Sequence, residues 1–242
     1  MSEAPTIAIL AGGLATRLGE LVANTPKALL DVLGKPFLAW QLDMLQRAGL
    51  ADVVICAGHL ADQIEGWVDA HAPTGMRVRI CRDGPRALGT GGALRQALPL
   101  LTDPFLVVYG DSYLRCDYLD VYRHFVRERQ GGNPPLALMT VFQNDNLLDT
   151  SNVVFRDGRI VRYDKRARSE DMRHIDWGLG ILSHQAFEAF AQQDAFDLAA
   201  VYQRLVERGR LSGYEVTERF YEIGSRSGLA ELREHLHQQG KV

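Results

Sequence analysis

The chain has 242 residues, of which 46% are hydrophobic and 24% charged, so it can bury a sizeable core. Its formal net charge of -3 argues against a general nucleic-acid or acidic-membrane binder, because such proteins need a basic surface. Cys56, Cys81 and Cys116 form no CxxC pair, and Cys56 lies in an apolar run typical of a buried thiol. Since the polar start also lacks the features of a signal peptide, we expect a cytoplasmic protein.

Short apolar runs alternate with helix-like stretches through the first half of the chain. The runs predict strands over 6–10, 53–57, 77–81, 105–109 and 136–142. The stretches between them predict helices over 36–48, 61–70, 91–98 and 117–128. This alternation predicts an α/β fold with a mostly parallel sheet that is covered on both faces. In such folds, ligands bind beyond the carboxyl ends of the strands.

The second half has a different pattern. Residues 152–163 predict a hairpin around Asp157-Gly158, because Asp-Gly is a strong turn signal. A strand is expected over 175–182, helices over 187–191 and 198–207, and one or two strands over 214–223. Leu229, Leu232 and Leu236 mark one face of a closing helix. We interpret this half as a small lobe that returns to the same sheet.

The most informative segment is the glycine-rich loop Leu10-Ala-Gly-Gly-Leu-Ala-Thr-Arg-Leu-Gly19, followed by Thr25-Pro-Lys27. Glycines after a strand let backbone N–H groups approach phosphate oxygens closely. Arg17 adds a fork of donors that suits a polyphosphate, and Lys27 adds a compact positive charge. Neither a Walker A motif nor a dinucleotide GxGxxG is present. The segment therefore predicts a phosphate loop of another kind, the alternative being an ordinary turn with surface cations.

The pattern LAGGxxTRL…TPKALL resembles the signature of the sugar-1-phosphate nucleotidyltransferases, also called sugar-nucleotide pyrophosphorylases. Gly34-Lys-Pro-Phe37, Leu88-Gly-Thr-Gly-Gly-Ala93 and Gly110-Asp111 follow in the family's order. The resemblance implies a three-layer, Rossmann-like fold with a small inserted substrate lobe. It further implies one domain over 1–242, with nucleotide bound by 1–142 and sugar phosphate faced by 143–242. The implied reaction joins a nucleoside triphosphate to a sugar 1-phosphate, with release of pyrophosphate.

The same resemblance assigns roles at the nucleotide end. Arg17 would hold the leaving pyrophosphate, and Lys27 would neutralise the α-phosphate and the incoming sugar phosphate. A helix-capping turn is the alternative for the second glycine segment, where Thr is a usual cap. The nucleotide-binding residues implied are Leu10, Ala11, Gly12, Gly13, Gly89, Thr90 and Gly91.

Asp111 and Glu222 are the candidate ligands for Mg²⁺, the one cofactor that the family implies. A carboxylate at the carboxyl end of strand 105–109 can ligate Mg²⁺ against substrate phosphates, whereas the alternative for Asp111 is a turn cap. The family's second carboxylate is usually an Asp in a pattern like W-x-D-I/V-G-T. Glu222, in Phe220-Tyr-Glu-Ile-Gly-Ser225, matches it with one methylene more. A solvent-facing strand residue is its alternative.

Four residues are candidates for the acceptor side. Lys165 and Asp164 resemble the family's E-K pair, so Lys165 would bind the sugar phosphate and Asp164 a sugar hydroxyl. Asn152 stands where many members have a glycine that faces the sugar, and Asp176 is placed to reach the sugar too. Surface charges in solvent are the alternative for the Asp-Lys pair.

The compact length and the 88–93 loop most resemble heptose-1-phosphate guanylyltransferases and N-acetylmuramate-1-phosphate uridylyltransferases. We favour guanylyl transfer to a heptose or hexose 1-phosphate, with uridylyl transfer as the alternative. A non-catalytic sensor of sugar nucleotides is supported only by the departures at Glu222, Asp164 and Asn152. A glycosyltransferase would normally show a DxD motif, which Asp111-Ser-Tyr113 is not. The expected partners are these two substrates, with no nucleic acid or membrane; the oligomeric state is not predicted.

Overall fold

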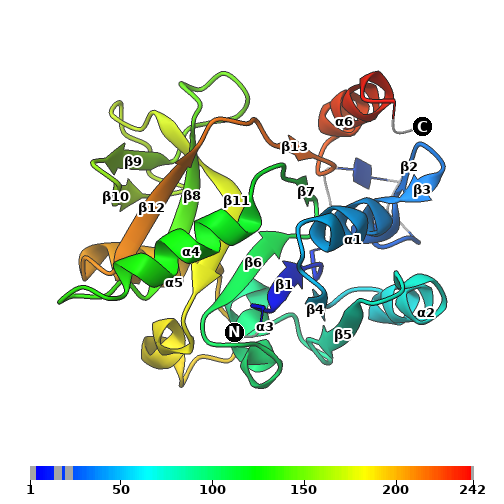
Figure 1. Ribbon diagram of the computed structural model, residues 1–242, viewed down its shortest axis with the longest axis horizontal. Helices are drawn as coiled ribbons and strands as arrows, with labels where there is room; N and C mark the ends of the chain where they lie inside the picture. Colours follow the sequence, from blue (N-terminus) through cyan, green and yellow to red (C-terminus); the bar gives the residue numbers. More distant parts are fainter. Residues whose placement is uncertain (1–3, 14–17, 20–23, 241–242) are drawn as a thin grey trace.

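A computed structural model describes residues 4–13, 18–19 and 24–240 of the chain. A nine-stranded sheet runs through both halves in the order β5-β4-β1-β6-β11-β8-β12-β10-β9 (Figure 1). Its strands are β1 (Ile7–Leu10), β4 (Asp52–Ala57), β5 (Arg77–Arg82), β6 (Phe105–Tyr109), β8 (Ala137–Gln143), β9 (Val153–Arg156), β10 (Arg159–Tyr163), β11 (His174–Leu182) and β12 (Leu211–Val216). The strands expected from the sequence are confirmed to within a few residues at their ends.

Strand β1 lies between β4 and β6 and pairs in parallel with both. Its side chains Ile7, Ala8 and Ile9 are fully buried, as expected for a continuous apolar run in a sheet covered on both faces. Strand β5 continues the parallel arrangement beyond β4. The loops that follow these four strands therefore meet at one edge of the sheet.

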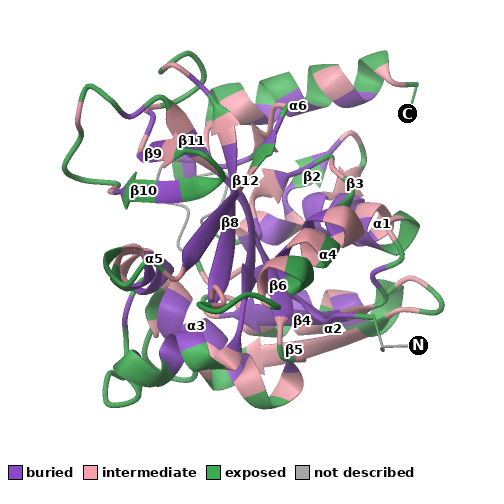
Figure 2. Cartoon of the chain, turned by 60° about the vertical axis from the view of Figure 1, so that its left-hand side comes forward, coloured by how far each residue is buried: buried purple, intermediate pink, exposed green. Residues whose placement is uncertain are grey.

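Helices cover both faces of the sheet and make three layers, as the sequence predicts. Successive β1 residues point to opposite faces, so Ile7 and Ile9 pack on one side and Ala8 and Leu10 on the other. In Figure 2 the buried strands lie between helices that are partly exposed. The first side carries α1 (Phe37–Arg47), α2 (Ala61–His71) and α4 (Tyr118–Glu128), and the second carries α3 (Gly89–Ala97) and α5 (Leu198–Glu207).

The sheet is mixed, and the expectation of a mostly parallel sheet does not hold for the second half. Strand β11 is antiparallel to both β6 and β8, and β12 is parallel to β8. Strands β9 and β10 form the expected hairpin, whose turn residues Asp157 and Gly158 have φ of 50° and 75°. Because β10 pairs with β12 and β9 pairs back with β11, five strands close into a small barrel. Apolar periodicity marks strands but not their direction, so the sequence did not reveal this.

The chain ends against a separate small core. Two short strands, β7 (Ser112–Tyr113) and β13 (Tyr221–Glu222), pair with each other, and α6 (Arg226–Gln238) follows. Its buried residues are Leu229, Leu232 and Leu236, which confirms the expected face. A second short pair, β2 (Asp31–Val32) and β3 (Lys35–Pro36), lies nearby, and the helix expected over 187–191 is the 3-10 helix η4 (His184–Phe190). No helix in the described part of the chain is long and apolar enough to span a membrane.

The first turn of α3 is fixed by contact with a distant segment. The backbone N–H groups of Gly91 and Gly92 donate to the Phe196 carbonyl, at 2.9 and 3.2 Å. A Cβ on Gly91 would overlap the ring of Phe196. Glycine at this position is therefore required by packing between the two halves of the chain.

Gly91→Ala is expected to lower the free energy of unfolding by about 1–3 kcal/mol, because the added methyl group overpacks the contact with Phe196. Urea unfolding followed by circular dichroism measures this change. Gly66→Ala is the matched control, since Gly66 lies in α2 with open space around it, and it should raise stability by about 0.5–1 kcal/mol. Equal stability of Gly91→Ala and the wild-type protein would contradict this account of the contact.

Candidate active site

A cavity of about 280 Å³ opens at the carboxyl ends of β5, β4, β1 and β6. Gly91 is not among the residues that line it, and Arg17 lies outside the described residues. The sequence-predicted residues in its lining are Leu10, Ala11, Gly12, Gly13, Lys27, Gly89, Thr90 and Asp111. Most of the expected nucleotide-end residues are thus brought together around one space.

Close backbone contacts build the floor of this cavity. The Ala11 N–H donates to the Cys56 carbonyl at 2.8 Å, and the Gly110 N–H donates to the Leu10 carbonyl at 2.9 Å. A Cβ on Gly110 would lie only 2.6 Å from that carbonyl oxygen, so glycine is needed there. The loops after β1 and β6 can therefore lie in contact, with Asp111 at the rim.

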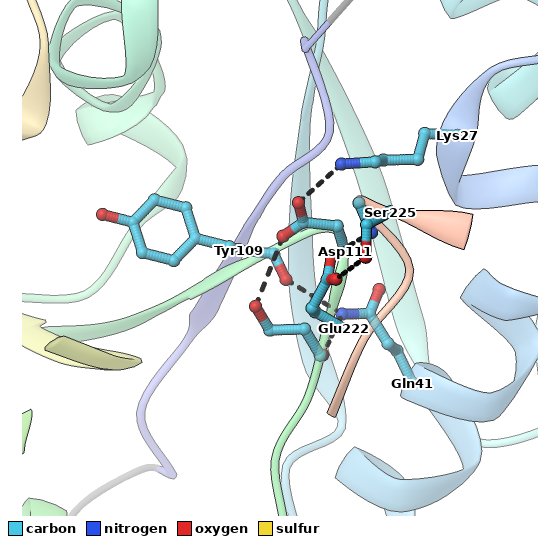
Figure 3. Close-up of polar contacts among 8 residues, drawn as sticks. Lys27, Gln41, Tyr109, Asp111, Glu222 and Ser225 are labelled. Atoms are coloured by element: carbon cyan, nitrogen blue, oxygen red, sulfur yellow. Dashed lines mark hydrogen bonds and ion pairs between the residues drawn. The ribbon is translucent and has the colours of Figure 1, made fainter. Parts of the chain in front are cut away.

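Lys27 and Asp111 form an ion pair at the cavity. Lys27 Nζ lies 2.6 Å from Asp111 Oδ2, and the side chains are 16% and 26% exposed. The Ser112 hydroxyl donates to the other carboxylate oxygen at 3.3 Å. Figure 3 shows the Asp111 carboxylate directed toward Lys27. Partial shielding from water strengthens the field of both charges on a bound phosphate or cation.

Gln41 fixes the turn that carries Asp111. Its side chain is 1% exposed, and Nε2 donates to the carbonyls of Tyr109 (3.1 Å) and Ser112 (2.9 Å), on either side of Asp111 (Figure 3). The sequence analysis missed this residue. The signal was a glutamine on the apolar face of helix α1, between Leu38 and Leu42. Because one buried amide holds both carbonyls, the turn that carries Asp111 has a fixed position relative to α1.

Glu222 lies next to this site but its carboxylate has other partners. In the β7–β13 pair it stands opposite Ser112. Its oxygens accept hydrogen bonds from the Gly224 N–H and, at 2.5 Å, from the Ser225 hydroxyl, as Figure 3 shows. Gly228, in the first turn of α6, leaves the space that the carboxylate occupies. In this arrangement the Glu222 carboxylate accepts hydrogen bonds within the loop before α6 and does not line the cavity.

The donor chemistry at the cavity fits Mg²⁺ with Asp111 as the protein ligand. Mg²⁺ usually binds through one or two carboxylates, completed by water and substrate phosphates. The described residues contain no cluster of three or more His, Cys, Asp or Glu side chains able to hold a metal. The described part of the chain therefore holds no all-protein metal cage, whereas a site completed by substrate phosphates and water needs only Asp111 from the cavity lining.

A second polar cluster, which we call the barrel cluster, consists of Asn152, Tyr163, Lys165 and Asp176 on β9, β10, β11 and their loops. The Asp176 carboxylate accepts a hydrogen bond from the Tyr163 hydroxyl at 3.2 Å. The backbone N–H of Asp176 donates to Asn152 Oδ1 at 3.0 Å. Burial raises the pKa of Asp176, and the charge of Lys165 opposes that rise. Lys165 Nζ lies 3.5 Å from the hydroxyl of Tyr109, which lines the cavity. The barrel cluster therefore adjoins the cavity through Tyr109.

Asp164 is brought beside this cluster, since its N–H donates to the Asn152 carbonyl at 3.0 Å. Its carboxylate accepts from the N–H groups of Ala167 and Arg166, both at 2.8 Å. These two bonds lower the pKa of Asp164, and the bond from Ala167 has the larger effect. The side chain is thus used to cap the turn after β10.

Asp83 is a further cavity residue that the sequence analysis missed. It directly follows β5, and its N–H donates to the Ala57 carbonyl at the end of β4. The rule that drew attention to Asp111, a carboxylate just past a parallel strand, applies to Asp83 equally. It was missed because none of the motifs quoted in the sequence analysis includes it.

Comparison with known proteins gives a matching family and several relatives. Residues 7–144 match the model of the MobA-like NTP transferase domain. The N-acetylmuramate α-1-phosphate uridylyltransferase of Caulobacter vibrioides is 40% identical over 88% of the chain and 89% of its own length. The D-glycero-α-D-manno-heptose 1-phosphate guanylyltransferase of Campylobacter jejuni is 24% identical over 89% of the chain and 93% of its own length. The chain spans only 50–60% of the length of several other curated relatives that it matches.

The fold also matches solved structures. HddC from Yersinia pseudotuberculosis, crystallised with GMP-PN, aligns with a TM-score of 0.77 over 96% of the chain and 100% of that structure, at 24% identity. This likeness covers the barrel half as well as the parallel half. It shows the fold, whereas the family match and the Caulobacter relative show that the chain belongs to the MobA-like NTP transferases of the sugar-1-phosphate nucleotidyltransferase family.

Proposed function

We propose that the protein transfers a nucleotidyl group from a nucleoside triphosphate to a sugar 1-phosphate, and that the whole chain acts as one catalytic domain. The observation that carries this proposal is that two polar groups adjoin one cavity. The Lys27–Asp111 pair lines the cavity, and the barrel cluster reaches the same cavity where Lys165 meets Tyr109. One group suits a triphosphate, and the other suits a phosphorylated, hydroxyl-rich acceptor.

The reaction is a direct displacement at the α-phosphorus. A phosphate oxygen of the sugar 1-phosphate forms the new P–O bond, while the bond between the α- and β-phosphates breaks and pyrophosphate leaves in line. The attacking oxygen is already an anion near neutral pH, so no general base is required. The protein must instead bring two anions together and offset their charge.

Each part of that task has a residue in this chain. Lys27 neutralises the α-phosphate and the incoming phosphate, and Lys165 binds the acceptor phosphate. Asp176, oriented by Asn152 and Tyr163, accepts hydrogen bonds from sugar hydroxyls. Asp111, in the turn that the Gln41 side chain holds by two hydrogen bonds, would ligate Mg²⁺. The ion would supply further charge neutralisation at the phosphates.

The finer substrate assignment within this proposal is guanylyl transfer to a heptose or hexose 1-phosphate. A second candidate is uridylyl transfer to an N-acetylmuramate-type 1-phosphate, which the 40% identity with the Caulobacter enzyme favours. Both assignments use the same phosphate chemistry, so they differ only in the base and in the acceptor ring.

Pyrophosphate release with Mg²⁺, each of the five common nucleoside triphosphates and a panel of hexose, amino-sugar and heptose 1-phosphates tests the proposal. We expect release that depends on both a triphosphate and a sugar 1-phosphate, because neither half of the site reacts alone. Silence across the whole panel would instead support a sugar-nucleotide sensor.

Asp111→Asn is expected to lower turnover by about 10³-fold, because it removes the charge that would hold Mg²⁺ at the phosphates. The free energy of unfolding should change by no more than about 1 kcal/mol, since the ion pair is partly exposed. The matched control is Asp43→Asn, which removes a carboxylate paired with Lys35 away from the cavity. Near-normal turnover of Asp111→Asn would refute the metal assignment.

Lys165→Met is expected to raise KM for the sugar 1-phosphate by about 10-fold or more, with KM for the triphosphate little changed, because a charged hydrogen bond is lost on the acceptor side only. Steady-state kinetics with each substrate varied in turn measures both constants. Arg162→Met removes an exposed cation three residues earlier, on β10, and serves as the control. Equal effects on the two KM values would place Lys165 outside the acceptor site.

A further inference from the structure

The Lys27–Asp111 pair joins two loops whose residues are 84 positions apart in the sequence. Lys27 begins the short 3-10 helix η2 (Lys27–Leu29), and Asp111 lies in the turn after β6. An ion pair that is still partly exposed contributes little free energy by itself, so it does not fix the separation of the loops. That separation matters, because a misplacement of about 1 Å at a reacting centre can lower a rate by about 100-fold.

The Asp111 side of the separation is set by helix α1 through Gln41. A side-chain amide has two N–H donors on its nitrogen. In Gln41 these donors bind the carbonyls of Tyr109 and Ser112, one on each side of Asp111. In the view of Figure 3, the Gln41 amide lies below this turn and Lys27 lies above it. The backbone of the Asp111 turn is therefore attached to α1 at two points.

The Lys27 side is attached to the same helix through the preceding residue, Trp40. The Trp40 indole N–H donates to the Val32 carbonyl at 2.9 Å, and the side chain is only 8% exposed. The Phe37 N–H, at the start of α1, donates to the Leu30 carbonyl at 2.9 Å. The Leu30 N–H in turn donates to the Lys27 carbonyl at 3.1 Å. The segment that begins at Lys27 is therefore also attached to α1 at two points.

Helix α1 has an anchor of its own, apart from both loops. Leu38, Leu42 and Leu45 are at most 1% exposed and pack in the same core as strand β1. With 3.6 residues per turn, neighbouring side chains on a helix are turned by roughly 100°. Trp40 and Gln41 therefore reach two different loops from adjacent positions on one support.

We propose that Trp40 and Gln41 are positioning residues that together set the position of Lys27 relative to Asp111, an inference that rests on the proposed nucleotidyl transfer. Neither side chain lines the cavity, so both act through the loops and not on a substrate. Release of either loop from α1 frees the distance between the two charges. One attachment is therefore of little use for this spacing once the other has been lost.

The competing explanation is that these two hydrogen bonds only stabilise the fold. The two explanations differ in how the effects of two substitutions combine. Bonds that only stabilise the fold leave the rate of the folded protein unchanged, and their losses add in unfolding experiments. Bonds that set one distance lower the rate singly, and losing both lowers it little further.

The test compares Trp40→Phe, Gln41→Met and the double variant in the full-length protein. Each single variant should lower kcat by about 10- to 100-fold, with KM for the sugar 1-phosphate unchanged to within about twofold. The double variant should lie within about threefold of the slower single variant, whereas the shifts in the urea midpoint should add. Trp40→Phe is the milder change, and the proposal stands or falls on it if Gln41→Met does not fold.

Calorimetric binding of inorganic tripolyphosphate with Mg²⁺ gives a readout that needs no turnover. Each single variant should bind it about 10-fold more weakly than the wild-type protein, because Lys27 and Asp111 no longer meet the phosphates together. The double variant should again be little weaker. Gln46→Met is the matched control, since it removes an amide bond from α1 to the Thr74 carbonyl on an exposed surface, and both readouts should stay unchanged.

Three results would overturn the proposal: normal kcat in both single variants, losses that multiply in the double variant, or an equal loss in Gln46→Met. Failure of the proposed function looks different. If the wild-type protein releases no pyrophosphate with any sugar 1-phosphate, while tripolyphosphate binding weakens as expected in the variants, the transfer reaction is refuted and the positioning role stands.

Discussion

The parallel pairing of β1 with β4 and β6 is the constraint on which the site depends. Because β1 is buried on both faces, its register with its neighbours is fixed by packing on each side. That register brings the ends of β5, β4, β1 and β6 to one edge. Gly12, Gly58, Asp83 and Asp111, which are far apart in sequence, meet there.

Two features attach the second half of the chain to this edge. Strand β11 joins β6 within the sheet, so the barrel strands extend the same surface on which the cavity opens. The Phe196 carbonyl caps α3, so the segment before α5 also supports the loop that carries Gly89 and Thr90. The second half of the chain therefore contacts the elements that line the cavity directly.

The carboxylates at the site differ in how their negative charge is compensated. Lys27 offsets Asp111, the Lys165 charge opposes the cost of burying Asp176, and Asp83 has no cation within the described residues. In the proposed reaction, the triphosphate would contact the first of these groups and the sugar 1-phosphate the second.

The sequence by itself indicated the residues that line the Lys27–Asp111 end of the cavity, because glycines, Lys27 and Asp111 lie in short motifs next to strong strand signals. Resemblance to the family's acceptor-side pattern also indicated Asn152, Lys165 and Asp176, which the structure brings together. The contacts of Gln41 and Asp83 required the tertiary structure, because Gln41 binds carbonyls 68 and 71 positions further along the chain and Asp83 lies beside glycines of two other loops. The direction of β11, the closure of the barrel and the turn of Glu222 toward Ser225 also depended on long-range contacts. Local patterns fix which residues are buried or can bind phosphate, but pairing partners are decided by which surfaces fit when the whole chain packs.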